Sequence, residues 1–73
     1  MNPFRKYRLE KNITVLNLSK TLGVTHNVIY RWEHDETYPS VPNFIALADA
    51  LGVTRNALMN ELIKYRKETY GDL

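Results

Sequence analysis

The chain has 73 residues, of which 44% are hydrophobic and 25% are charged, and it contains no cysteine. These values suit one small folded domain, and they exclude a disulfide scaffold, a thiolate metal site and an active-site cleft between two domains. The net charge is +2, but residues 1–31 carry six basic groups and one acid, whereas residues 32–63 carry one basic group and five acids. This asymmetry favours an anionic partner for the first half, although a mixed solvated surface accounts for it equally well.

Start and stop signals of helices recur along the chain, and no segment shows the alternation of a strand. An Asn-Pro pair at the N-terminus opens a helix over about residues 3–11, and Asn12 suits the left-handed turn that ends it. Thr14 caps a second helix, which runs to about residue 22. Gly23 then supplies the positive φ of a tight turn.

Three further helices are predicted in the rest of the chain. The third begins after Thr25 and runs to about residue 34, and the fourth lies between Ser40 and Gly52. The fifth begins after Thr54, continues through Arg66 and frays before Gly71. We expect one domain over residues 1–70 and a loose C-terminal end over residues 71–73.

Only Leu22-Gly23-Val24 joins the second and third helices, so the two must cross steeply, as in a helix-turn-helix. On a helical wheel, Val28, Ile29 and Trp32 form an apolar face of the third helix. The other face has neither acid nor Lys, and it consists of His26, Asn27, Tyr30, Arg31 and His34. Asn matches adenine and Arg matches guanine or phosphate, so this face suits the major groove. An ordinary solvated face is the alternative.

Short motifs at fixed spacings carry a resemblance to a known family. They are Leu18-Ser19, Leu22-Gly23-Val24-Thr25, Trp32-Glu33, Pro39-Ser40 and Ala50-Leu51-Gly52-Val53, the last within "LADALGVTRNAL". Over about residues 4–62, the chain resembles the lambda-repressor-like (Cro/repressor-type, XRE) helix-turn-helix family. The resemblance implies an all-α, five-helix domain that binds specific double-stranded DNA and is not an enzyme. The lack of a second domain is similar to Cro-type repressors and implies a phage or mobile-element origin.

The resemblance also implies roles for single residues. Arg8 and Glu33 match a structural salt bridge. Base contacts are expected from His26, Asn27, Val28, Tyr30 and Arg31. Contacts to the DNA backbone are expected from Thr14, Val15, Thr25, His34, Tyr38, Ser40 and Asn43. For Ser40 and Asn43, turn and cap chemistry is an equally good interpretation.

Val15 and Leu16 depart from the family pattern, which usually has polar residues at these positions. Val15 cannot hold a phosphate with its side chain, so backbone N–H groups at the helix N-terminus would have to do so. The two side chains either pack against the first helix or form an apolar surface for a protein partner. The second possibility is the rival function, an antirepressor-like or antitoxin-like module that binds another regulator.

The fifth helix carries two stripes at helical spacing. One stripe consists of Leu58, Leu62 and Tyr65, and the other of Met59, Ile63, Arg66 and Tyr70. Because one core needs only one face of this helix, the second stripe predicts a homodimer surface. Two copies would place their third helices in successive major grooves of a pseudo-palindromic operator.

The sequence indicates no metal, cofactor, small-molecule substrate or catalytic site. His26 and His34 are about 12 Å apart along one helix and cannot share a metal ion. No apolar run approaches the ~20 residues of a membrane span, and no signal peptide is visible. We therefore expect a cytoplasmic, nucleoid-associated protein of a bacterium or a phage-infected cell.

Overall fold

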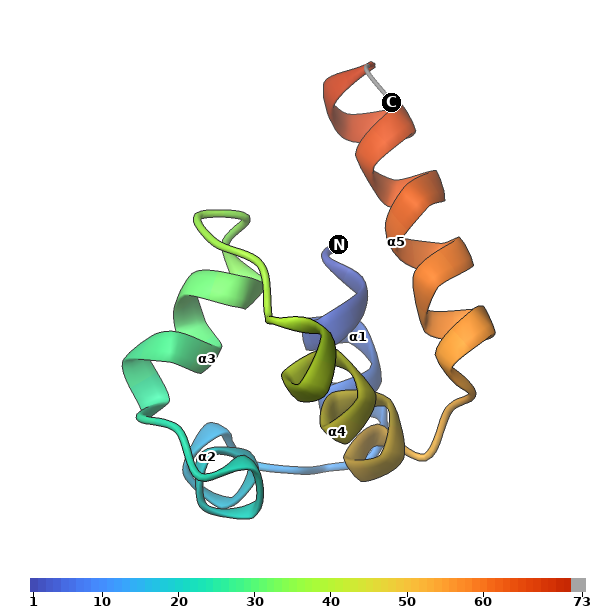
Figure 1. Ribbon diagram of the computed structural model, residues 1–73. Helices are drawn as coiled ribbons and strands as arrows, with labels where there is room; N and C mark the ends of the chain where they lie inside the picture. The colour runs from blue at the N-terminus through green and yellow to red at the C-terminus, as the bar shows by residue number, and fades with distance from the viewer. Residues whose placement is uncertain (72–73) are drawn as a thin grey trace.

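The computed structural model describes residues 1–71, which form five α-helices. In chain order they are α1 (Pro3–Glu10), α2 (Val15–Leu22), α3 (His26–Glu33), α4 (Val41–Leu51) and α5 (Arg55–Tyr70). The helices α2 and α3 lie on one side and α5 on the other, with α1 and α4 between them (Figure 1). The predicted all-α class and the number of helices are confirmed. Within the described part of the chain, no helix has the length and hydropathy needed to cross a membrane.

Caps and left-handed residues bound the helices close to the predicted positions. The Asn2 side chain accepts hydrogen bonds from the first turn of α1, and Gly23 and Gly52 end α2 and α4 at φ 71°. Asn12 and Asp35 have φ values of 57° and 61°, a region that Asn and Asp tolerate better than most residues. Short polar residues and glycines therefore determine where each helix stops.

The fifth helix is longer than the sequence predicted. It stays helical through Tyr70, whereas fraying was expected after Arg66, and the N–H of Gly71 caps it by donating to the Lys67 carbonyl at 2.9 Å. Gly71 is thus the C-cap of α5, and residues 72–73 of the expected loose end lie outside the described residues. The hydroxyls of Tyr65 and Tyr70 hold this last part of α5 against Asp35.

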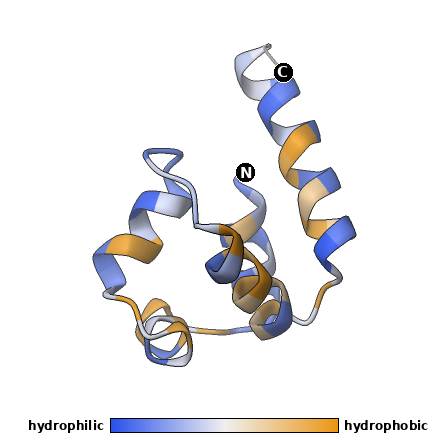
Figure 2. Cartoon of the chain, viewed as in Figure 1, coloured by the Kyte–Doolittle hydropathy of each residue, from blue (hydrophilic) through white to orange (hydrophobic). Residues whose placement is uncertain are grey.

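All five helices contribute to one hydrophobic core. Its buried members are Phe4, Leu18, Ile29, Trp32, Leu47, Ala48, Leu51, Leu58 and Leu62. Each fully buried large side chain contributes roughly 1.5–3 kcal/mol relative to an exposed one. Figure 2 shows apolar residues along nearly the whole of α4, the helix at the centre of the molecule. The core therefore buries the side of α3 that carries Ile29 and Trp32, and it leaves the opposite side exposed to solvent.

Candidate nucleic-acid interface

The turn between α2 and α3 is tight and closed by hydrogen bonds. Gly23 takes the left-handed conformation, and the N–H of Val24 donates to the Ser19 carbonyl at 3.1 Å. Ser19 itself is buried, and its hydroxyl donates to the Leu16 carbonyl at 2.7 Å. A small side chain at this position lets α3 cross closely over α2. The helix-turn-helix is therefore a rigid unit in which α3 has one fixed orientation.

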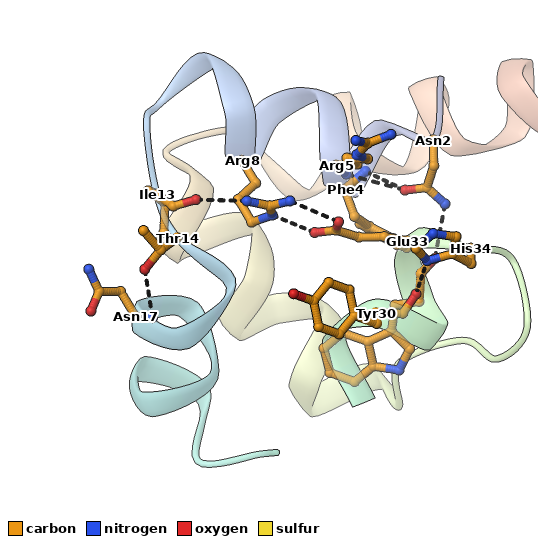
Figure 3. Close-up of polar contacts among 11 residues, drawn as sticks. Asn2, Phe4, Arg5, Arg8, Ile13, Thr14, Asn17, Tyr30, Glu33 and His34 are labelled. Atoms are coloured by element: carbon orange, nitrogen blue, oxygen red, sulfur yellow. Dashed lines mark hydrogen bonds and ion pairs between the residues drawn. The ribbon is translucent and has the colours of Figure 1, made fainter. Parts of the chain in front are cut away.

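A buried ion pair ties the end of α3 to α1. Nε and Nη2 of Arg8 donate to Oε2 and Oε1 of Glu33 at 2.6 and 3.0 Å, and Nη1 donates to the Ile13 carbonyl at 3.0 Å (Figure 3). Arg8 is 9% exposed and Glu33 is 5% exposed. The hydrogen bond to Glu33 raises the pKa of Arg8 although burial acts against it. The structure thus brings this predicted pair together and gives every buried charge a partner.

The outward side of α3 carries two parallel rows of polar and aromatic side chains. His26, Tyr30 and His34 form one row, with successive ring centroids 6.3 and 6.4 Å apart. Asn27 and Arg31 form the other row, and both are exposed. Val28 differs from the other predicted base contacts, because it is half-buried and packs against the core.

His34 occupies the C-cap of α3, where its ring is fixed. Its Nδ1 lies 2.7 Å from the Tyr30 carbonyl oxygen. Because a carbonyl oxygen only accepts, Nδ1 carries a proton in this contact. The exposed ring therefore leaves Nε2 for an outside partner.

Three of the residues predicted to contact the DNA backbone, Thr14, Thr25 and Ser40, have hydroxyl side chains, and they differ in whether the hydroxyl already accepts a hydrogen bond within the protein. The side chains of Thr14 and Ser40 accept the N–H of Asn17 and Asn43 at 3.1 and 3.3 Å. Thr25, at the N-cap of α3, makes no such side-chain bond. The Thr25 hydroxyl is therefore free to bind outside the protein, while Ser40 has the capping role that the sequence left open.

The apolar pair at the start of α2 is only partly exposed. Leu16 is 54% exposed, whereas Val15 is half-buried and packs against the core. Both residues lie in the first turn of α2, where backbone N–H groups have no partner within the helix. The apolar surface predicted here thus consists mainly of Leu16.

Tyr38 lies between the predicted DNA side and α5. Its ring is exposed, and the Arg66 guanidinium lies over it at 5.1 Å from the ring centroid. Arg66 also lies over the ring of Tyr70, at 4.3 Å. Tyr38 therefore contacts Arg66 in the last turns of α5, and the sequence did not predict this contact.

Two of the six basic groups in residues 1–31 are paired within the protein. Arg8 bonds Glu33, and Lys6 lies 3.9 Å from Glu61 at the surface. The remaining four are exposed: Arg5, Lys11, Lys20 and Arg31. The positive charge offered to an anionic partner is thus smaller than the sequence count suggested.

Sequence reasoning missed one polar cluster, centred on Asp35. Its carboxylate accepts hydrogen bonds from Asn2 Nδ2 at 2.8 Å and from the hydroxyls of Tyr65 and Tyr70 at 2.5 Å each. Burial acts to raise the pKa of Asp35, but the bonds from Tyr65, Tyr70 and Asn2 outweigh it, and the pKa is lowered. The bond to Asp35 and burial raise the pKa of Tyr65 to about 12. Only the positive φ tolerance of Asp35 was visible in the sequence.

Comparison with known proteins agrees with this geometry. Neither a search of curated proteins nor a search of solved structures gives a match to the chain. The sequence profile of a helix-turn-helix family matches residues 4–58, from α1 into the first turn of α5. Because this match covers more than half of the chain, the protein belongs to the lambda-repressor-like helix-turn-helix family of DNA-binding regulators.

Proposed function

We propose that the protein is a sequence-specific regulator of transcription that reads double-stranded DNA with α3. The observation that carries this proposal is the outward side of α3, where every exposed side chain has hydrogen-bonding groups and none is acidic. A helix fits the major groove, and its N-terminal residues reach the base edges. The rigid turn and the buried Arg8–Glu33 pair present this side in one orientation.

Within α3, the side chains suit different parts of a base pair. Asn27 can form two hydrogen bonds to adenine N6 and N7, and Arg31 can form two to guanine O6 and N7. His26 and Tyr30 flank them and supply single hydrogen bonds to bases. Val28 is half-buried, so only its outer methyl would reach a thymine methyl group.

Contacts to the DNA backbone would fix the register of α3. The free N–H groups of the first turn of α2, at Val15 and Leu16, suit one phosphate. The unoccupied hydroxyl of Thr25 and the ring of His34 suit the phosphates at the two ends of α3. Thr14, Ser40 and Asn43 remain further candidates, although the Thr14 and Ser40 hydroxyls also cap helices.

Two copies would bind a pseudo-palindromic operator. A helix of eight residues reads only a few base pairs, so the site that one copy recognises is too short to define one operator. A dimer places two such helices in successive major grooves, about 34–36 Å apart. The exposed stripe of Met59, Ile63 and Tyr70, with Arg66 beside it, is the dimer surface that the sequence predicted. At a promoter, such a dimer would regulate transcription by occlusion, as a Cro-type protein does, or by recruitment.

Selection of bound sequences from random duplex DNA, at low and at moderate salt, tests this proposal. We expect a two-fold symmetric site that is still enriched at moderate salt. A featureless pool whose binding disappears with salt would show that the contacts are only electrostatic, and it would contradict the proposal.

The exposure of Leu16 favours a second candidate function, the binding of another regulator. At 54% exposure, Leu16 offers an apolar anchor beside the helix-turn-helix. Leu16→Lys should abolish such a complex while Arg31→Ala leaves it unchanged. The opposite pattern, loss with Arg31→Ala alone, is expected for DNA binding.

A further inference from the structure

Two histidines lie on the outward side of α3, and different contacts hold their rings. His26 is the first residue of the helix and His34 is its C-cap, and both side chains are exposed. Nδ1 of His34 lies 2.7 Å from the carbonyl oxygen of Tyr30 (Figure 3), whereas the His26 ring packs edge-to-face against the Tyr30 ring. A hydrogen bond therefore fixes one particular nitrogen of His34.

The Tyr30 carbonyl decides which nitrogen of a neutral His34 ring carries the proton. A neutral imidazole has one N–H group and one nitrogen with a lone pair. Because the carbonyl oxygen only accepts, the N–H group is at Nδ1 and the lone pair is at Nε2. A phosphate oxygen of DNA also accepts, so the neutral ring has no donor for it. Neutral His34 thus cannot make the phosphate contact that its position at the end of α3 favours.

Protonation of the ring supplies the missing donor without moving it. In an imidazolium both nitrogens donate, so Nδ1 keeps its bond to the Tyr30 carbonyl while Nε2 gains an N–H group. The same carbonyl accepts the backbone N–H of His34 at 2.9 Å, which holds the residue at the helix end. A bond from an imidazolium to a phosphate is charge-assisted and about twice as strong as a neutral one. The charged ring is therefore already oriented to bind a phosphate.

Three carboxylates are close to His34 in the sequence, and two of them are engaged within the protein. Glu33 is buried and accepts two hydrogen bonds from Arg8 of α1. Asp35 accepts hydrogen bonds from the N-cap of α1 and from two tyrosine hydroxyls of α5. Glu36, in the connection after α3, is exposed. These charges are present with or without DNA, so only an outside anion changes the balance between the neutral ring and the imidazolium on binding.

The cations of the neighbouring elements leave Nε2 of His34 to an outside acceptor. They are Arg31 on the other row of α3, Arg5 of α1, Lys20 of α2 and Arg66 of α5. The first three are exposed, so solvent and salt screen them from the ring, and Arg66 lies over two tyrosine rings. Arginine and lysine only donate, so none of the four can accept the Nε2 proton. A DNA phosphate is the acceptor that the position of α3 supplies.

We propose that His34 binds a DNA phosphate only as the imidazolium, so that each copy of the protein takes up a proton when it binds its operator. The proposal rests on the proposed function, because it needs DNA beside the C-terminal end of α3. Histidine side chains change charge between about pH 5 and pH 8, so operator affinity should rise as the pH falls through this range. A neutral ring that used its Nε2 lone pair would accept from a base amino group, and acid would then weaken binding.

The state of the ring is tested in the free chain. Nitrogen NMR of the imidazole groups at about pH 8 distinguishes a nitrogen that carries a proton from one that carries a lone pair. We expect the proton of His34 at Nδ1. A proton at Nε2 would overturn the proposal, because the neutral ring could then donate to a phosphate without taking up a proton.

The binding test compares His34→Gln with His26→Gln in the full chain, on the duplex obtained by sequence selection. Both residues are exposed on α3, so both variants should fold like wild type, which circular dichroism checks. Affinities are measured at constant moderate salt at about pH 5.5 and about pH 8. Only the ratio of the two affinities is compared, so a contact that a variant loses equally at both pH values cancels.

For wild type and His26→Gln, we expect each copy to bind about tenfold more tightly at the lower pH. The ratio for His34→Gln should be close to one. Isothermal titration calorimetry in two buffers with different heats of ionisation should show proton uptake near neutral pH for wild type and His26→Gln, and none for His34→Gln. A pH ratio and a proton uptake that His34→Gln retains would overturn the proposal.

Failure of the proposed function has a different signature. If no duplex is bound specifically at either pH, the DNA-reading proposal fails, and the role of His34 fails with it. Specific binding that does not depend on pH, or that acid weakens, would leave the proposed function intact and overturn only the role of His34.

Discussion

The hydroxyl of Tyr65 donates a 2.5 Å hydrogen bond to Oδ2 of Asp35, which lies thirty residues earlier in the chain. Tyr70 bonds the same oxygen, and Asn2, the N-cap of α1, bonds the other. The carboxylate of Asp35, in the connection between α3 and α4, therefore links the start of α1 to the last turns of α5. These hydrogen bonds attach the last turns of α5 to the rest of the fold, and they predict a pH-dependent stability at both ends of the pH scale.

At alkaline pH, two of the five tyrosines should ionise late, because hydrogen bonds to Asp35 raise the pKa of Tyr65 and that of Tyr70, and the larger shift is that of Tyr65. The hydrogen bond to Asp35 and burial raise the pKa of Tyr65 to about 12. The folded pKa lies above the ordinary value near 10, so the stabilisation is complete below about pH 10 and is lost as pH rises through about 12. Ultraviolet titration of tyrosinate should show this late step, and it should be missing from Tyr65→Phe. A wild-type curve without a late step would contradict the bond.

At acid pH, Asp35 contributes with the opposite sign. Its folded pKa is lowered below the ordinary value, so its stabilisation is present at neutral pH and is lost as pH falls through the folded pKa. Asp35→Asn keeps a residue that tolerates the φ of 61°. We expect it to lower the free energy of unfolding by about 1 kcal/mol at pH 7 and to weaken its dependence on acid. Urea unfolding at several pH values measures both, and an unchanged acid dependence would contradict the assignment.

Removing one partner of the Arg8–Glu33 pair should destabilise the fold strongly. Both side chains are buried, so Glu33→Ala leaves the Arg8 guanidinium without its anion. The expected loss is about 3–5 kcal/mol in the free energy of unfolding. Arg8→Met combined with Glu33→Leu should recover much of this loss, because neither charge is then buried alone. Chemical unfolding of Arg8→Met, of Glu33→Leu and of the double variant gives the coupling energy of the pair, and additive losses would exclude a coupling.

Helix caps and turn glycines, which act within one turn of the chain, predicted most of the fold. The features that the sequence missed involve contacts between residues that are distant in the sequence. Gly23, Gly52 and the caps act within one turn, so the sequence located those helix ends correctly. The end of α5 depends on Tyr70 and Asp35, which are 35 residues apart and belong to no local motif.

In the candidate site, too, the sequence predicted what depends on one helix and missed what depends on contacts between elements. The helical period alone separates the exposed Asn27 and Arg31 from the buried Ile29 and Trp32. It cannot show that Tyr38 lies beneath Arg66, or that the Thr25 hydroxyl makes no cap bond, because both depend on how side chains from several elements are arranged.

Thr25 and Thr54 provide a matched pair that separates DNA contact from helix capping. Both are N-cap threonines, but only Thr54 accepts a hydrogen bond from its helix, at 3.0 Å from Ala57 N. Thr54→Ala should cost about 1 kcal/mol of stability and leave DNA affinity unchanged. Thr25→Ala should leave stability almost unchanged and weaken operator binding by about 1.5–3 kcal/mol through loss of a hydrogen bond to an anionic phosphate. Thermal unfolding and binding titrations test the pair, and equal stability losses in both variants would contradict it.

Asn27 and Arg31 should determine which bases the protein prefers. Both are exposed on α3 and remote from the core, so Asn27→Ala and Arg31→Ala should fold like wild type. Each should lose about 1–3 kcal/mol of operator binding, and the preference should relax at one position of each half-site. Lys20→Ala is the control for charge, because Lys20 is exposed on α2, outside the outward side of α3, and its loss should weaken all sequences alike. If repeated sequence selection gave Arg31→Ala the same preferred site as wild type, Arg31 would be a backbone contact, and the assignment of its row of α3 to base recognition would be wrong.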